Sequence, residues 1–597
     1  MTDHFDDPNA RSARMGRRSL LKGAAAAAAT AATATSVSHA QGPTNPMITG
    51  TSRFQEATPV SSYPPPSPSV TELQEALASG GATVRSIVEE ALARIDALDK
   101  QGPSINAVIE INSEALAIAD ELDAELAAGT PRGPMHGIPV LIKDNIGTAD
   151  TMETTAGSLA LVGLKATSDS SVARQLREAG MVIVGKTNLS EWANIRSFQS
   201  TSGWSGRGGQ TVNPYVLDRN ASGSSSGSGA AAAAGYVAVT IGTETNGSIV
   251  SPAGHCGVVG IKPTVGLVSR VGVIPISHSQ DTIGPMARTV ADAAALLNVL
   301  AVPDPEDPAS RGEWPTSPPP AATPEATPEM TILPIPSYPL QPSGGDPVVN
   351  YTTVLDPAGL QGARIGVARQ LAGFSPHADA VFEEAIAAMQ AAGAEIVDPV
   401  EIPSLADRAW EADTLPVLEW ELKAGLAEYF ANFLPADSSI TSLADVIAFN
   451  DEHAAEEMPW FDQQIFLNSE ARSGLDDIEY INAVLRIQYA GRDNGLDVAL
   501  RDNALDALIA PTNAPASKID LINGDHWLGG TSTLAAIAGY PLVTLPAGYR
   551  HGLPVGITFM GGAFSEATLV KLAYAFEQQV QVWTEPTFVP GSVIPPE

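Results

Sequence analysis

Two glycine- and serine-rich loops constrain this chain more than any other feature of its sequence. They cover residues 223–228 and 243–248, and a mostly apolar stretch, residues 230–241, lies between them. Lys143 ends a second apolar run, residues 138–142. Glycine lets a backbone turn tightly and approach a ligand closely, and serine becomes a nucleophile once a base accepts its proton. The pattern therefore indicates a serine enzyme that uses a lysine, and no histidine, as its base.

The first forty residues have the features of an export signal. Arg17 and Arg18 form a twin arginine, an alanine-rich run at 24–34 follows, and residues 38–40 offer small side chains for cleavage. The run is shorter than the roughly 20 apolar residues that span a bilayer. We therefore expect residues 1–40 to be a twin-arginine signal peptide and the mature protein to be periplasmic or extracellular.

The net charge and the cysteine content exclude several kinds of partner and several kinds of covalent or metal cross-link. The formal net charge of −34 repels phosphate backbones and anionic lipid headgroups. We therefore expect no nucleic acid partner, no stable membrane association after processing, and a monomer or weak homodimer. Cys256 is the only cysteine, so no intrachain disulfide and no cluster of thiolate metal ligands can form.

The sequence also predicts neither a metal nor a cofactor. It contains no His-Glu-x-x-His motif. His453 lies near Glu456 and Glu457, an arrangement that we interpret as the polar side of a helix. His255, beside Cys256, is interpreted as a packing position near the active loops.

Short apolar runs alternate with helical patterns from about residue 69 onward, which predicts an α/β domain around a buried, parallel or mixed sheet. The predicted strands are 138–142, 181–184, 236–241, 364–367, 507–510, 542–545 and 555–559, and the clearest predicted helices are 170–179, 290–300, 378–392 and 567–578.

Two segments are too rich in proline, serine and threonine to supply a packed core. Residues 41–68 are predicted to be an extended leader, and residues 303–347 an exposed insertion. We expect the insertion to interrupt one domain, residues 69–597, without dividing it.

The segments around the serine loops resemble the amidase signature family. The resemblance rests on residues 213–215, 242–249, 251–253 and 257–264 at the family's spacing. It implies a central mixed β-sheet covered by helices on both faces. It also argues against a flexible Gly/Ser linker, which residues 221–235 alone would suggest.

The resemblance implies a role for three residues. Ser248 would be the nucleophile, Ser224, behind a cis peptide bond, would relay its proton, and Lys143 would be the base. The lysine must then be neutral. Its ordinary pKa is about 10.4, and burial can lower a lysine pKa by about 3 to 5 pH units, so the position of Lys143 after an apolar run satisfies this demand.

The second serine loop would also supply the oxyanion hole. The resemblance implies backbone N–H donors from Thr245, Asn246, Gly247 and Ser248. Many family members have an aspartate and two glycines before the nucleophile, whereas this chain has Glu244, Thr245, Asn246 and one glycine. This difference concerns the space around the leaving group.

A finer resemblance, to bacterial peptide amidases, rests on residues 266–270, 274–277, 279–282, 284–288, 421–426 and 442–450. It implies removal of the C-terminal amide nitrogen of peptides as ammonia. An amidase acting on aryl or aliphatic amides is the alternative, and a non-catalytic binding protein on the same scaffold is a remote one. The glutamine-dependent tRNA amidotransferase subunit shares the lysine and serines, but the export signal and the charge argue against it.

Two further hypotheses concern individual residues. Gly223-x-Ser225-x-Gly227 fits the nucleophile elbow of α/β-hydrolases, but residues 216–221 lack the strand that should precede an elbow. Trp192, Trp204 and Phe449 are candidate apolar walls of a substrate pocket, with core packing as the alternative for each.

Overall fold

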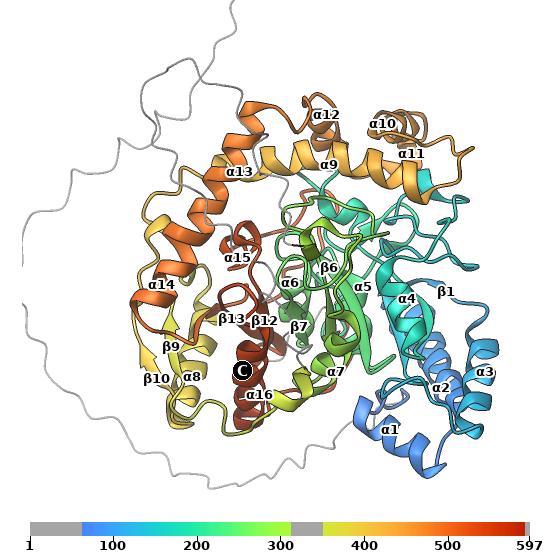
Figure 1. The fold of residues 1–597 in the computed structure, drawn as a ribbon, viewed down its shortest axis with the longest axis horizontal. Helices are drawn as coiled ribbons and strands as arrows, with labels where there is room; N and C mark the ends of the chain where they lie inside the picture. Colours follow the sequence, from blue (N-terminus) through green and yellow to red (C-terminus); the bar gives the residue numbers. More distant parts are fainter. Residues whose placement is uncertain (1–62, 312–349, 592–597) are drawn as a thin grey trace, which may run out of the picture. The chain divides into compact units, whose positions relative to one another are not determined.

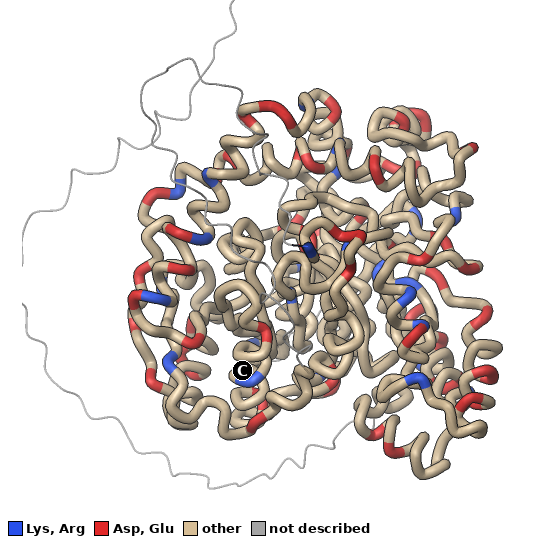
Figure 2. Tube along the Cα trace, viewed as in Figure 1, with Lys and Arg blue, Asp and Glu red and all other residues tan. Residues whose placement is uncertain are grey.

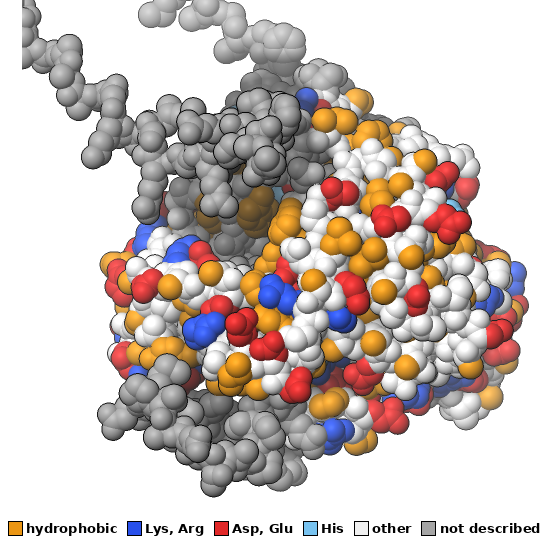
Figure 3. Space-filling model, turned by 90° about the horizontal axis from the view of Figure 1, so that it is seen from above, with side chains coloured by type: hydrophobic (Ala, Val, Ile, Leu, Met, Phe, Trp, Pro, Cys, Tyr) orange, Lys and Arg blue, Asp and Glu red, His pale blue; other side chains and the backbone are white. Residues whose placement is uncertain are grey.

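The computed structural model describes residues 63–311 and 350–591, which belong to one compact unit that begins at Ser61 (Figure 1). The predicted signal peptide, residues 1–40, and most of the predicted leader lie outside the described residues. No helix in the described ranges combines the length and apolarity needed to cross a bilayer. Asp and Glu residues are spread along the outer helices (Figure 2), and on the face in Figure 3 they are interspersed with apolar and neutral side chains.

An 11-stranded mixed sheet forms the centre of the unit, in the order β1-β3-β2-β6-β8-β7-β12-β13-β11-β9-β10. The parallel neighbours are β2 with β3 and with β6, and β9 with β10 and with β11. The predicted fold class is therefore confirmed. The strands are β1 (Val108–Ile111), β2 (Pro139–Lys143), β3 (Val182–Thr187), β6 (Val239–Glu244), β7 (Val259–Lys262), β8 (Thr282–Ala287), β9 (Arg364–Val367), β10 (Glu395–Val397), β11 (Ala507–Pro511), β12 (Leu542–Arg550) and β13 (Leu553–Met560), with a separate pair, β4 (Trp204–Ser205) and β5 (Gly209–Gln210).

Helices cover both faces of this sheet, because alternate side chains of each strand point to opposite faces. In β2, Val140 and Ile142 belong to one buried apolar cluster with α4, α7, α8 and α16, whereas Leu141 belongs to another with α2, α3, α5 and α6. The α-helices of eight or more residues are α1 (Val70–Ser79), α2 (Val84–Ile95), α3 (Ala115–Ala127), α4 (Ser171–Glu178), α5 (Ser226–Ala233), α7 (Val290–Leu300), α8 (Pro376–Ala391), α9 (Glu411–Phe433), α10 (Leu443–Glu452), α13 (Ile478–Gly491) and α16 (Glu566–Val580). Shorter ones are α6 (Val250–Cys256), α11 (Ala454–Glu457), α12 (Gln464–Glu470), α14 (Asp497–Asp502) and α15 (Thr533–Ala538).

The parallel pairing of β2 with β6 brings distant parts of the sequence together. Ile142 lies opposite Ile241, so the carboxyl ends of both strands meet at the same edge of the sheet. β2 ends at Lys143, and β6 leads through Thr243 into the second serine loop. The sheet therefore places the lysine and this loop side by side.

The predicted limits of the two proline-rich segments need correction. Asp304 and Asp307, at the start of the predicted insertion, are buried. Asp304 accepts hydrogen bonds from two buried serines, and Asp307 forms an ion pair with Arg270. At the end of the predicted leader, Ser67 is buried and its N–H donates to Gly235. These polar anchors hold both segments against the domain, so proline content alone misplaced the boundaries.

Candidate functional site

Lys143 lies at the carboxyl end of β2 with no exposed surface. Its Nζ is 2.8 Å from Ser224 Oγ, 2.8 Å from Thr243 Oγ1 and 3.2 Å from the Thr243 carbonyl oxygen. Burial lowers the pKa of Lys143 to about 7, although the carboxylates of Asp281 and Glu244 raise it. A large share of the lysine is therefore neutral at neutral pH.

The three neighbours of Nζ match the needs of a neutral amine. A charged lysine has three N–H donors and no acceptor. The carbonyl oxygen of Thr243 can only accept a hydrogen bond, so Lys143 keeps one N–H directed at this oxygen after it loses a proton. The lone pair is then free to accept the hydroxyl proton of Ser224. A neutral Lys143 in this geometry could therefore accept the proton of Ser224.

The two serine loops are joined to each other. The peptide bond between Gly223 and Ser224 is cis, as the family resemblance implies. The N–H of Ser225 donates to the carbonyl oxygen of Ser248 at 3.1 Å. A Cβ atom on Gly223 would lie only 2.2 Å from Ser190 Oγ, so a larger residue has no room there. The loops therefore hold Ser224 and Ser248 in one compact site.

Ser248 lies in the turn between β6 and α6, and its residue is 8% exposed. In the part of the chain that the structure describes, its Oγ forms no hydrogen bond to protein. The hydroxyl is therefore free to turn toward Ser224 or toward a substrate.

The predicted oxyanion donors divide into two groups. The N–H of Gly247 donates to Glu244 Oε1 at 2.8 Å, so it is already used. The N–H groups of Thr245, Asn246 and Ser248 donate to no acceptor among the described residues. Three of the four predicted donors thus remain available for a ligand.

Glu244 explains how this loop manages with fewer glycines. Besides Gly247, its carboxylate accepts the N–H groups of Ile249 and Val250 at 2.8 and 2.9 Å. It therefore satisfies donors at the start of α6 that have no partner within the helix. The side chain of Glu244 is longer than that of an aspartate, so its carboxylate reaches across the turn to these N–H groups.

Ser225, the alternative nucleophile, is part of the scaffold. It has no exposed surface, its Oγ donates to the Thr243 carbonyl at 3.0 Å, and it accepts the Thr243 N–H at 3.1 Å. No strand directly precedes it, since residues 221–224 are irregular and residues 219 and 220 form only isolated bridges. The nucleophile elbow hypothesis is therefore not supported.

We expect Ser225→Ala to lower kcat by less than about tenfold, because it removes only scaffold hydrogen bonds, each worth about 1 kcal/mol. Steady-state kinetics on a primary amide would measure this, with circular dichroism to verify folding. Loss of activity as complete as in Ser248→Ala would restore Ser225 as the candidate nucleophile.

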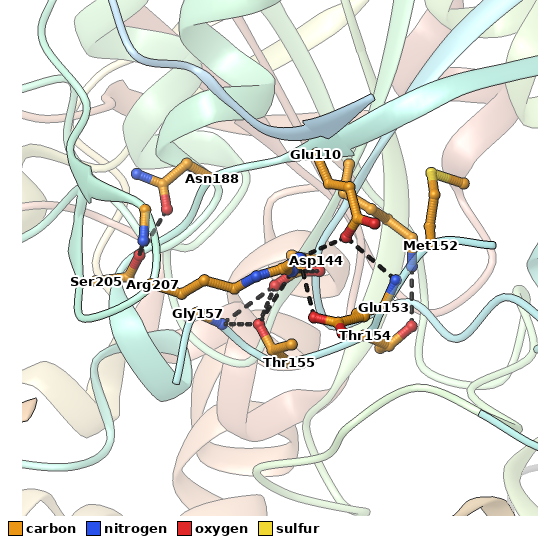
Figure 4. A network of polar contacts seen from close by, with 12 residues as sticks. Glu110, Asp144, Met152, Glu153, Thr154, Thr155, Gly157, Asn188, Ser205 and Arg207 are labelled. Carbon is orange, nitrogen blue, oxygen red and sulfur yellow. Dashed lines mark hydrogen bonds and ion pairs between the residues drawn. The ribbon is translucent and has the colours of Figure 1, made fainter. Parts of the chain in front are cut away.

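A network of charged groups surrounds Asp144, the residue that follows Lys143 in the chain (Figure 4). Asp144 follows Lys143 and is fully buried; its carboxylate accepts from Thr155 Oγ1 and the Gly157 N–H. Arg207, between β4 and β5, lies 3.5 Å from Asp144, 2.5 Å from Glu110 and 3.1 Å from Glu153. One guanidinium thus connects three carboxylates from separate segments and holds the end of β2 in place.

We expect Arg207→Met to lower the free energy of unfolding by about 3 kcal/mol, because it leaves the buried carboxylate of Asp144 without its arginine partner. Denaturant unfolding would measure it. Arg501→Met is a matched control, because Arg501 pairs with Asp502 on an exposed surface where ion pairs contribute little. Equal losses in both variants would contradict a special role for Arg207.

A cavity of about 640 Å³ opens beside Ser224, Thr243 and Thr245. Its volume lies within the range of pockets for small ligands. Arg270, its only Lys or Arg in the described lining, is tied to Asp307. Apolar residues form much of the wall, among them Val271, Val273, Ile274, Ile276, Tyr429 and Phe433.

The predicted apolar wall must be corrected, because Trp192, Trp204 and Phe449 do not line this cavity. Trp192 packs edge-on against Phe466, and Trp204 packs edge-on against Phe461. Phe449 stacks on the ring of His453. All three contribute to side-chain packing, the alternative that the sequence left open.

The histidines have structural surroundings. His255 is buried, its Nε2 lies 3.0 Å from the Ala514 carbonyl, and burial lowers its pKa to about 4. Glu457 was predicted on a polar helix side, but it is fully buried and accepts the Leu159 N–H. Within the described ranges, no group of three or more His, Cys, Asp or Glu residues is arranged to hold a metal.

Two residues of the site escaped the sequence analysis. Asn145 lines the cavity and donates to Thr243 Oγ1 at 3.0 Å. Asp281 also lines it and accepts from Thr245 Oγ1 at 2.5 Å. Asn145 could have been noticed from its place two residues after Lys143, whereas the distant Asp281 has no such signal.

The sequence of this chain is similar to those of known amidases and related proteins. The model of the amidase family matches residues 86–570. A probable amidase of Arabidopsis thaliana is 38% identical over 83% of this chain and 87% of its own length. A glutamyl-tRNA(Gln) amidotransferase subunit from Myxococcus xanthus is 34% identical over 85% of this chain and 96% of its own length.

Solved structures resemble the chain as well. The native peptide amidase from Stenotrophomonas maltophilia is 45% identical, with a TM-score of 0.77, and the match covers 87% of this chain and 98% of that one. An amidase family protein from Bacillus anthracis is 33% identical, with a TM-score of 0.73, over 87% of this chain and 92% of that one.

Proposed function

We propose that this chain, which belongs to the amidase family and hydrolyses the C–N bonds of linear amides, removes the C-terminal carboxamide nitrogen of peptides as ammonia. The observation that carries the chemistry is the buried contact of 2.8 Å between Lys143 Nζ and Ser224 Oγ. It lies beside the loop of Ser248 and opens onto the cavity.

The proposed reaction starts with neutral Lys143. The lysine draws the proton of Ser224, and Ser224 takes that of Ser248, whose Oγ attacks the amide carbon. The oxyanion that forms is stabilised by the free N–H groups of the Ser248 loop, and one such donor is typically worth about 2.7 to 4 kcal/mol.

Collapse of the tetrahedral intermediate breaks the C–N bond. The proton held by Lys143 returns through Ser224 to the leaving nitrogen, which departs as ammonia and leaves an acyl-enzyme on Ser248. Water then attacks the ester by the same proton path, and the acid is released with Ser248 regenerated. No cofactor is needed for these steps.

The choice of peptides rests on two supports. The solved peptide amidase is similar over nearly its whole length. The cavity is also largely apolar, as a groove for varied side chains of a peptide requires. Aryl or aliphatic amides are the second candidate class, since relatives named simply as amidases are similar too. A non-catalytic role would not require a neutral buried lysine in contact with a serine.

Export is part of the proposal. The twin arginine and the alanine-rich run support it, and peptides with terminal amides would then be met outside the cytoplasm. Sequencing the N-terminus of protein from a periplasmic or culture fraction tests this, and an N-terminus at Met1 would refute it.

We expect the processed protein to convert a C-terminally amidated peptide into the free acid without shortening it. Mass spectrometry should show a gain of about one mass unit, because NH₂ is replaced by OH. A panel of peptide, aryl and fatty amides and free glutamine, assayed for ammonia with and without a chelator, compares the substrate classes. Internal cleavage, or inertness toward peptide amides with rapid turnover of aryl amides, would overturn the peptide assignment.

A further inference from the structure

The side chain of Asn145 is bound at one end only. Its Nδ2 donates to Thr243 Oγ1 at 3.0 Å and to the Ile274 carbonyl oxygen at 3.4 Å. Because a carbonyl oxygen only accepts, the contact with Ile274 fixes which end of the amide is the nitrogen. The other end, Oδ1, is buried and has no hydrogen-bond partner among the described residues.

Such an oxygen is costly in a folded protein, so an unpaired buried acceptor calls for an explanation. Asn145 is 4% exposed, and it lines the cavity together with Ser224 and Thr243. The cavity is the open space that this residue lines, so a group bound there is the candidate source of the missing donor.

Asn145 is also close to the reacting groups. A single hydroxyl, Thr243 Oγ1, accepts from both Asn145 Nδ2 and Lys143 Nζ, at 3.0 and 2.8 Å. Lys143 in turn contacts Ser224 at 2.8 Å. Asn145 is therefore two hydrogen bonds away from the lysine that handles the proton of the leaving group.

We propose that Asn145 Oδ1 accepts an N–H of the departing carboxamide nitrogen and thereby selects primary amides. The inference rests on the proposed function, since it concerns the leaving group of that reaction. A primary amide carries two N–H donors on a nitrogen with no further substituent. A secondary amide replaces one of them with carbon, which cannot donate and needs more room.

The leaving group offers a direct test, because an ester of the same acid has no N–H. In Asn145→Ala, the ratio of kcat/KM for the primary amide to kcat/KM for the methyl ester should fall about 10- to 100-fold, the loss expected for one hydrogen bond to a reacting group. Both kcat/KM values report steps up to acylation, so slow deacylation of the ester does not affect the comparison.

Asn145→Asp is the matched variant, because it keeps Oδ1 but loses the Nδ2 contacts. Its two rates should fall together, and the ratio should stay within about threefold of the wild-type value, since the acceptor is retained. If Asn145 merely positions Lys143 through Thr243, both variants lower amide and ester rates equally and shift the pH profile. An unchanged ratio in Asn145→Ala overturns the proposal, as does an equal fall of the ratio in Asn145→Asp.

The acyl group is chosen from whichever primary amide the wild-type enzyme hydrolyses. A failure of the peptide assignment then appears in the substrate panel, and a failure of the Asn145 assignment appears in the ratio. The two outcomes are therefore independent.

Discussion

Ser248→Ala should lower kcat by at least about 10⁴-fold, because every other serine hydroxyl of the two loops is engaged in a hydrogen bond. Its Oγ lacks a hydrogen bond within the described structure, whereas Ser224 contacts Lys143 and Ser225 is tied to Thr243. Ammonia release from a primary amide measures the loss. A Ser248→Ala enzyme that retains a tenth of wild-type turnover would refute the assignment.

Lys143→Ala should be nearly as inactive, and the double variant with Ser248→Ala should be little worse than either single one. Residues that act as one unit show such non-additive effects. Ser225→Ala, in the neighbouring serine loop, serves as the control for the loss of a serine hydroxyl close to the site. Additive losses in the double variant would mean that Lys143 and Ser248 work separately.

The pH profile of kcat/KM should rise with a pKa of about 7. Below this pH Lys143 is protonated and cannot accept a proton, and above it the amine is neutral. Rates on a neutral substrate from pH 5 to 9 would measure the rise. A flat profile over this range would argue against a titrating lysine.

Asp281→Asn should move this rise to lower pH. The carboxylate of Asp281 raises the pKa of Lys143, so removing its charge lets burial depress that pKa further. The half-buried carboxylate also accepts two backbone N–H groups, so thermal unfolding of the variant must be checked. A shift to higher pH would contradict the electrostatic account.

The free energy of unfolding should also depend on pH, because Lys143 has different pKa values in the folded and unfolded states. Unfolded Lys143 has a pKa of 10.5 and the folded one about 7, so between these values the unfolded chain binds one more proton. Stability then rises by about 1.36 kcal/mol per pH unit over that window, and below it the folded state bears the full cost of the buried charge. Lys143→Met should remove this slope relative to wild type, and an unchanged slope would mean that the folded lysine stays protonated.

Local sequence patterns predicted correctly those helices and strands whose formation depends mainly on their own residues. The predicted helix 290–300 and strand 364–367 match α7 and β9 to the residue. In α7 the N-cap Thr289 bonds the N–H of Asp292, and the helix presents an apolar face. Such signals lie within one segment, so no knowledge of the rest of the fold is required.

Strand β8 shows where local patterns fail. It contains Gly284 and Pro285, which argue against a central strand, and the sequence analysis did not predict it. It nevertheless pairs with β6 and β7. Pairing on both sides outweighed the weak propensity of its residues.

The substrate cavity could not be read from sequence for a related reason. An apolar residue is equally suited to a core and to a pocket wall, so nothing local separates Trp192 and Phe449 from Tyr429 and Phe433. Only the crossing of α9 over the loops of residues 270–283 decides which rings face the cavity.

The sequence by itself determined the family resemblance, the α/β class, and the presence of Ser224 and Ser248 in glycine-rich loops and of Lys143 after an apolar run, because these depend on residue types and spacing along the chain. Tertiary structure alone decided the state of the lysine. Its pKa depends on burial and on the charges of Asp281 and Glu244, which are near it in space and far from it in sequence. Electrostatic interactions weaken with distance through space, and only the folded chain sets that distance.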